Sequence, residues 1–470
     1  MLKKLFSHTA IYGFAPQITK IASFFSLPLI TQELTELDYG IAGVLTAYTS
    51  AIAVFSFLGL RVVLVNSYFK SPKQFKWAWR QIYGFLSIWN IAYAFFLGAL
   101  IYFIVPTEAN DQRWLIVLLH IGPIVFFGPT SNICSTYYQL KQKPFQIAIR
   151  SVVFGILTIV LNVVFIANYK MGFMGWFWSS FIVGVIRNLS FYYPLNFVLK
   201  LTPIFNFKWR LIKSSLSVSL PMIPHYYSNY LLNSSDKMVM DVSGISTGNI
   251  GKYNVAYTVG RFTNNLGSAS GLAIGPLLNK FYKDNNDMAA SFLIFILQVS
   301  FFMITCLLSV WMKEIFYFLL RNETLSQMYY LGIIIVMSYN YRPMYFAANS
   351  KLMFSEKTNI LWRVTLGAGL VNVILNLILL PIYGFEIAAI TTFVAYIFMG
   401  YSGFSFKVFK QLTNANYYPL IWLFITLILT ILVYLFKDFT ISNKIIISII
   451  FLLVGTFAIV AFNMKLKEIT

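Results

Sequence analysis

Basic side chains recur inside long apolar stretches of this sequence, where a charged residue is costly. Within these stretches we find one acid, Asp236, and a larger set of cations: Lys20, Arg61, Arg187, Lys237, Lys252, Arg261 and Arg342. A cation near the middle of a bilayer costs roughly 2.5–3.5 kcal/mol. One acid cannot pair with all of these cations, so the sequence predicts a water-filled, positively charged cavity that binds an anion.

A diphosphate is the anion that suits these cations, because an arginine offers it a planar pair of donors. Lys237 and Lys252 lie near the ends of their apolar stretches, where a lysine can reach the lipid headgroups instead. For the deeper cations, a role in helix packing is the alternative. The candidate substrate-binding cations are Lys20, Arg61, Arg187, Arg261 and Arg342.

Asp236, Lys237 and His225 form a second candidate site, for coupling or gating of a conformational change. His225 lies eleven residues before Asp236, which on one continuous helix corresponds to about 16 Å. A proton relay between them would therefore need water or other groups. The alternative for Asp236 is to cap a helix or pair with a neighbouring lysine.

Prolines interrupt several apolar stretches, where they free backbone carbonyls and kink helices. Such breaks act as hinges in some transporters and as packing kinks elsewhere. The candidate hinges are Pro16, Pro28, Pro221 and Pro224. Gly267, Gly271 and Gly275 form a stripe of small residues that predicts close helix packing.

The composition identifies the apolar stretches as membrane spans. Of the 470 residues, 59% are hydrophobic and only 11% are charged, whereas a soluble domain has about 25% charged residues. Runs of about 20 apolar residues span a bilayer. We therefore predict an all-α integral membrane protein with about 14 transmembrane helices, near residues 10–32, 40–66, 81–105, 114–139, 145–168, 171–199, 214–240, 251–280, 289–311, 326–350, 360–381, 384–407, 417–436 and 444–464.

The formal net charge of +20 is concentrated in short loops, which argues against a nucleic-acid partner. If the N-terminus is cytoplasmic, Lys and Arg favour the inner loops by more than three to one, and the first outer loop is acidic, with Glu33, Glu36 and Asp38. An even number of spans then places both termini in the cytoplasm. The predicted location is the bacterial cytoplasmic (inner) membrane, with multiple passes.

The sequence repeats itself with a spacing near 210 residues. Residues 9–35 can be laid on 217–243, and Leu161-Asn162 on Leu375-Asn376. We predict two parallel six-helix repeats around a central cavity, because such repeats enclose the substrate site between them. The predicted parts are an N-lobe over 1–205 (helices 1–6), a C-lobe over 206–412 (helices 7–12) and two extra helices, 13 and 14, over 413–470.

Residues 217–283 carry a moderately specific resemblance to a known family. Residues 220–225 read Leu-Pro-Met-Ile-Pro-His, residues 235–237 read Ser-Asp-Lys, and residues 251–257 read Gly-Lys-Tyr-Asn-Val-Ala-Tyr. The chain thus resembles the O-antigen and polysaccharide flippases of the multidrug/oligosaccharidyl-lipid/polysaccharide exporter superfamily. The resemblance implies outward transfer of an undecaprenyl-pyrophosphate-linked oligosaccharide. It also implies membrane lipids, a polysaccharide polymerase and a chain-length regulator as partners.

Two other functions stay open at this stage. A cation-coupled multidrug exporter of the same superfamily should have acids in its first-lobe spans, and we find none there. A membrane glycosyltransferase or polymerase would need carboxylates or a large outer loop. We predict a transporter rather than an enzyme. We find no metal-ligand spacing and no phosphate-binding loop, so no cofactor is expected, and an ion gradient or the membrane potential would supply the energy.

The predicted orientation can be tested with fusions to alkaline phosphatase, which is active only outside the cytoplasm. Fusions after Asp38, Asp111 or Asp438 should be active, and fusions after Lys73 or Lys208 should be inactive, because lysine and arginine hold loops inside. A reversed pattern would contradict the orientation and the direction of transport.

Overall fold

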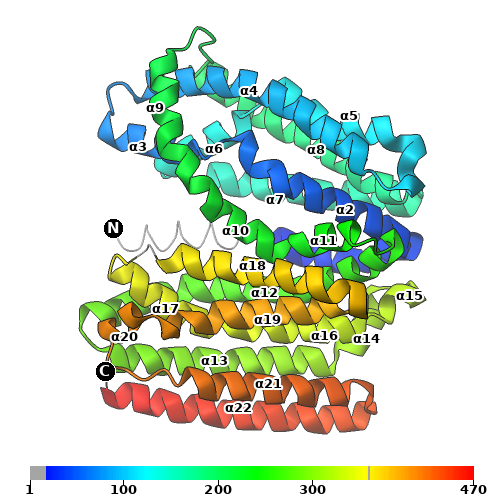
Figure 1. The fold of residues 1–470 in the computed structure, drawn as a ribbon, viewed down its shortest axis with the longest axis vertical. Coiled ribbons are helices and arrows are strands. Elements are labelled where there is room, and N and C mark those ends of the chain that lie inside the picture. Colours follow the sequence, from blue (N-terminus) through cyan, green and yellow to red (C-terminus); the bar gives the residue numbers. More distant parts are fainter. Residues whose placement is uncertain (1–16, 358–359, 470) are drawn as a thin grey trace. The chain divides into compact units, whose positions relative to one another are not determined.

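The computed structural model describes residues 17–357 and 360–469, except for the side chains of His225, Asn229, Leu266 and Leu272. All secondary structure in this part of the chain is helical (Figure 1), which confirms the predicted fold class. Among the described residues, eight helices are long and apolar enough to span a membrane, or nine if the bent pair Thr107–Phe127 and Thr130–Leu140 is one span. Each of the 14 predicted stretches contains helix in its described part, but several are broken, so the number of spans stays a prediction.

The chain packs as two compact units, Met1–Tyr227 and Ser228–Thr470. In unit 1, a helix over 17–30 is followed by α2 (Glu36–Ile52), α3 (Arg61–Lys70), α4 (Phe75–Ile104), α5 (Arg113–Phe127), α6 (Thr130–Leu140), α7 (Pro144–Asn162), α8 (Phe173–Tyr193) and α9 (Trp209–Ser219). The division between the units falls inside α10 (Ile223–Asn233).

Unit 2 contains the remaining helices, and it includes the two helices after residue 412. They are α11 (Ser235–Val242), α12 (Thr247–Lys283), α13 (Asp287–Val310), α14 (Met312–Leu319), α15 (Glu323–Ser326), α16 (Tyr329–Ser338), α17 (Arg342–Phe354), α18 (Leu361–Tyr383), α19 (Ile387–Tyr401), α20 (Lys407–Leu412), α21 (Pro419–Leu435) and α22 (Ile441–Ile469).

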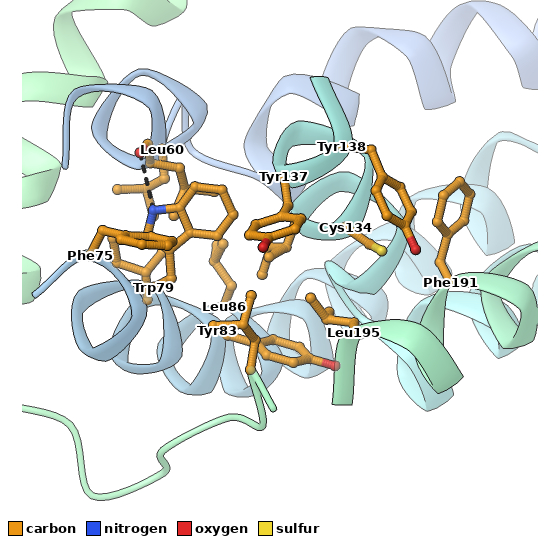
Figure 2. Close-up of a cluster of buried hydrophobic side chains, with 14 of the residues drawn as sticks. Leu60, Phe75, Trp79, Tyr83, Leu86, Cys134, Tyr137, Tyr138, Phe191 and Leu195 are labelled. Carbon is orange, nitrogen blue, oxygen red and sulfur yellow. Dashed lines mark hydrogen bonds between the residues drawn. The ribbon is translucent and has the colours of Figure 1, made fainter. Parts of the chain in front are cut away.

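A buried aromatic cluster joins α3, α4 and α6 of unit 1. Figure 2 shows Tyr137 and Cys134 of α6 lying close to Trp79, Tyr83 and Leu86 of α4. The Trp79 ring meets Tyr137 edge-on at 6.2 Å between centroids, and its Nε1 donates to a carbonyl of α3 at 3.1 Å. Paired aromatic rings and a satisfied indole N–H fix the mutual positions of these helices.

The segment after α8 is bonded to α4 on both sides of residue 205. The Arg80 Nε donates to the Thr202 carbonyl at 2.9 Å, and the Ile204 amide donates back to the Arg80 carbonyl at 2.9 Å. The Lys208 amide donates to the Gln81 side chain at 2.7 Å. Gly84 allows this approach, because a Cβ there would collide with the Ile204 carbonyl.

The acidic segment around the start of α2 is also structural. The Thr35 and Asp38 side chains cap the start of α2 reciprocally, and Asp38 Oδ1 accepts a bond of 2.8 Å from the Phe173 amide at the start of α8. Gly172 has a φ of +55° and faces this carboxylate, so a side chain there would be both strained and obstructed. Asp38 thus ties two helix starts together.

The last two helices pack within unit 2 rather than apart from it. In Figure 1, α22 runs alongside α13, and α21 also contacts α13. Lys444 of α22 is 0% exposed, and its Nζ lies 2.7 and 2.9 Å from the two carboxylate oxygens of Glu314 in α14. The ion pair anchors α22 to unit 2.

We predict that Gly84→Ala weakens unit 1, because the added methyl group must separate α4 from residues 202–204. Forcing a methyl group into such a contact costs about 1–3 kcal/mol. Thermal unfolding of the purified protein should show a lower Tm. Gly275→Ala is the matched control, since nothing lies within 4 Å of a Cβ at Gly275. Equal Tm values for the two variants would contradict the prediction.

Candidate functional site

A fully buried carboxylate in unit 2 is held by four neutral donors. Asp236, in the first turn of α11, is 1% exposed. It accepts hydrogen bonds from the Tyr253 hydroxyl (2.7 Å), the Asn372 amide (2.5 Å), the Asn376 amide (2.9 Å) and the Thr392 hydroxyl (3.0 Å). These donors come from α12, α18 and α19, so one carboxyl group joins four helices. We call these five residues the Asp236 cage.

A further hydrogen bond orients the cage. The Thr391 hydroxyl donates to Asn376 Oδ1 at 2.6 Å, which turns the Asn376 amide nitrogen toward Asp236. Within the described side chains, Asp236 forms no ion pair. A buried ionised carboxylate without a counter-ion is costly even when it is hydrogen-bonded. The cage is therefore chemically suited to take up a proton or a cation.

The neighbouring Lys237 contacts residues outside the Asp236 cage. Its Nζ donates to Asn254 Oδ1 at 2.9 Å and lies 5.6 Å from the centre of the Tyr257 ring. Lys237 is only 6% exposed, so the expectation that it reaches the headgroups is wrong. The alternative that Asp236 pairs with a lysine is wrong for the described side chains, because no lysine forms an ion pair with it and the Lys237 Nζ donates to Asn254.

His225 and Asp236 do not share a continuous helix, contrary to the sequence-based expectation. Helix α10 ends at Asn233, and Ser234 has φ −141° and ψ −14°, outside the α-helical region. The estimated distance along one helix therefore does not apply. The His225 side chain lies outside the described part of the structure, and its role in coupling stays a prediction.

The proline-containing stretch before Asp236 is also broken. Pro221 lies in a short 3-10 helix, Leu220–Met222, which separates α9 from α10, and Pro224 lies in the first turn of α10. Pro28 lies within the helix over 17–30, whereas Pro16 is outside the described residues. A hinge at any of these prolines remains a prediction.

Two of the candidate cations lie in unit 2 in different environments. The Arg342 guanidinium, at the start of α17, donates to the Asn264 carboxamide of α12 and packs on Gly267. Phe346 packs on Gly271 in the same way, so these two glycines provide the predicted close packing. Arg261 is exposed on α12. Arg342 therefore has a clear packing role, and Arg261 has a more accessible charge.

The other three candidate cations lie in unit 1, and one of them faces a cavity. Arg61, at the start of α3, donates to Gln139 Oε1 of α6 at 2.5 Å and lines a cavity of about 320 Å³. Arg187 is exposed on α8, and Lys20 is exposed on the helix over 17–30. The structure thus brings Arg61 to a pocket within its own unit, and the binding roles of all five cations stay predictions.

Sequence reasoning missed the polar side chains that surround Asp236. It found Asp236 but not Tyr253, Asn372, Asn376 or Thr392. A signal was present, because Asn372 and Asn376 are four residues apart in an otherwise apolar helix and so lie on one face. Among the described residues, no cluster of three or more His, Cys, Asp or Glu side chains is arranged to hold a metal ion.

The comparisons identify the fold. No protein-family model and no curated protein matches this sequence. Among solved structures, the chain is similar to the lipid II flippase MurJ in its inward closed conformation, with 16% identity, a TM-score of 0.72, and coverage of 96% of this chain and 97% of that one.

Two further similar structures are transporters of the MOP superfamily. One is an inward-facing multidrug resistance transporter of the MATE family, with 14% identity, a TM-score of 0.57, and coverage of 87% of this chain and 96% of that one. The other, from Pyrococcus furiosus, has 15% identity, a TM-score of 0.55 and coverage of 87% and 96%.

These similarities place the chain, by its fold, in the class of multi-pass membrane proteins with the two-lobe, 14-helix architecture of lipid II flippase and MATE transporters. Two of these similar structures are described as MOP superfamily transporters, and the sequence resembles members of the same superfamily.

Proposed function

We propose that this protein is a flippase that moves an undecaprenyl-pyrophosphate-linked oligosaccharide from the cytoplasmic to the outer leaflet by alternating access. The observation that carries the proposal is the excess of cations in the spans, together with a fold shared with a lipid II flippase. A diphosphate brings negative charge to such cations, and its glycan brings hydroxyl groups. The glycan would be an O-antigen or a related surface polysaccharide unit, which a polymerase and a chain-length regulator would then assemble.

The distribution of acids favours this proposal over a multidrug exporter, although the fold is shared with MATE transporters. Unit 1 has only five acidic residues, and all of them lie before or within the first turn of α2 or in the 3-10 helix that precedes α5: Glu33, Glu36, Asp38, Glu108 and Asp111. A cationic drug would find no carboxylate deep in the spans of this unit. A sugar-transferring enzyme would likewise lack carboxylates there.

Two energy sources fit the described residues. The Asp236 cage, as the coupling or gating site together with Lys237 and His225, could take up a proton or a cation from an ion gradient. The membrane potential is the other source, because moving one charge across 100 mV is worth roughly 2.3 kcal/mol. The membrane potential favours the movement of a negatively charged diphosphate toward the positive outer face. Pro16, Pro28, Pro221 and Pro224 are the proposed hinges.

Replacing Arg261 with Ala should abolish surface glycan while leaving the protein level and membrane insertion intact. Arg261→Lys should restore export in part, because one charge remains but the paired donors are lost. Arg342→Ala should also abolish export, but it removes a packing contact with Gly267, so its Tm must be measured as well.

Arg363→Ala is the matched control for Arg261→Ala, because Arg363 is an exposed cation at the start of α18 and is not a candidate for substrate binding. Surface glycan, measured by lectin or antibody staining, should stay normal in this variant. Normal export by both the Arg261→Ala and Arg342→Ala variants would reject a role for these cations in binding the diphosphate.

Replacing Asp236 with Asn should slow export more than it weakens substrate binding, because the amide keeps the shape of the cage but cannot hold a negative charge. Transport should be measured in reconstituted vesicles, with the pH gradient and the potential set independently by ionophores. Asp241→Asn is the control, since Asp241 lies on the same helix outside the cage. If wild type and Asp236→Asn both ignore the pH gradient, proton coupling is rejected and the potential remains.

A further inference from the structure

Helix α6 presents a polar face inside an otherwise apolar protein. Asn132, Ser135, Thr136 and Gln139 are spaced so that they lie on one side of the helix, and all four line the cavity that Arg61 faces. Among the described residues, the Asn132 carboxamide has no hydrogen-bond partner. In a membrane protein, a polar face that lines a cavity indicates contact with water or with a polar ligand.

The opposite face of α6 holds the helix in place. Ile133, Cys134, Tyr137 and Tyr138 are buried in the aromatic cluster, with Tyr137 against Trp79 (Figure 2). The polar face is therefore carried by a rigid element rather than by a loop. The binding of a ligand to this face therefore carries little free-energy cost for ordering the protein.

The other walls of the cavity add one cation and one aromatic ring. A 3-10 helix, Ala53–Ser56, and a tight turn at Gly59, with φ +67°, interrupt the helical stretch before Arg61. Among the described residues, Gln139 is the only hydrogen-bond partner of the Arg61 guanidinium, so other N–H groups of Arg61 can meet a ligand. Tyr226 of α10 completes the lining.

We propose that this pocket binds a single anionic sugar unit of the transported glycan, with the acidic group on Arg61 and the ring hydroxyls on the polar face of α6. The proposal rests on the proposed flippase function and names the part of the substrate that this site takes. The volume of about 320 Å³ is at the small end of ligand pockets, roughly 300–1,000 Å³, so the pocket suits one ring rather than the whole oligosaccharide.

The chemistry of the lining explains this choice. The Ser135 and Thr136 hydroxyls donate to the Asn132 carbonyl at 3.1 and 2.8 Å, which leaves their oxygens as acceptors for sugar hydroxyls. The Asn132 and Gln139 amides can donate as well as accept. Arg61 is the one charged residue among the described residues of the lining, so the site matches a ligand with one acidic group and several hydroxyls. The acidic group is a carboxylate or a phosphate.

The test is direct binding of soluble sugars to the purified full-length protein in lipid nanodiscs, by saturation-transfer NMR and calorimetry. The probes are glucuronate, glucose 1-phosphate and glucose. We expect saturable binding of one or both anionic sugars, at least tenfold tighter than that of glucose. Binding of glucuronate alone identifies a carboxylate sugar, and binding of glucose 1-phosphate alone identifies a sugar phosphate.

Three variants locate the binding. Gln139→Glu keeps the size of the side chain but places a carboxylate on Arg61, so it should weaken anionic sugars at least tenfold and leave glucose unchanged. Asn132→Ala should weaken all bound sugars. Lys73→Gln removes one exposed cation from the loop between α3 and α4 and should change nothing. Tm values close to wild type confirm that the variants are folded.

Two results would overturn the proposal. One is the absence of saturable binding of either anionic sugar, and the other is equal binding of these sugars by wild type and Gln139→Glu. Either result would mean that the pocket holds water alone. The flippase function is judged separately, by transfer of a fluorescent lipid-linked oligosaccharide in vesicles. Transfer without sugar binding rejects only the pocket. Binding at the pocket without transfer rejects the flippase function.

Discussion

The dominant constraint on this protein is that charged and polar side chains placed within a membrane must be satisfied by the protein itself. Asp236 shows how completely this can be done, with four neutral donors from three other helices around one carboxyl group. These bonds fix the relative positions of α11, α12, α18 and α19. They leave the charge uncompensated, so the same residues that hold the helices together also make the site sensitive to a proton or a cation.

The same constraint shapes the helices that face cavities. Helix α6 packs one side into the aromatic cluster and keeps the other side polar. Arg342 lies over Gly267, where a larger residue would leave no room for its side chain. A cation in a span can therefore be a packing element or a ligand group. Its neighbours decide between these roles, since an isolated arginine in a sequence carries no information about which surface it meets.

The sequence predicted what depends on local patterns. Apolar run length located most of the helical stretches, and the resemblance predicted a fold that the similar solved structures share. The break at Ser234 was not predictable, because no proline or glycine marks it. The partners of Asp236 could be found only in part, since two asparagines on one face of α18 indicate a polar contact but not the acid they meet. Unit 1 extends beyond residue 205, where the Lys208 amide contacts Gln81, a residue more than 100 positions earlier that no local pattern points to.

The electrostatics of unit 2 limit how Asp236 can act. Neutralising Asp236 removes a negative charge beside Lys237, which would strengthen the binding of an anion nearby, and by linkage a bound anion would strengthen proton binding equally. An inward proton gradient drives outward export only if the proton and the substrate bind to different conformations. The mutual strengthening of proton and anion binding favours binding of both to the same conformation. Proton-driven export would therefore require the Asp236 cage to open in one conformation alone. The helix break at Ser234, directly before α11, is the element that would let Asp236 leave its four donors without unfolding the rest of unit 2.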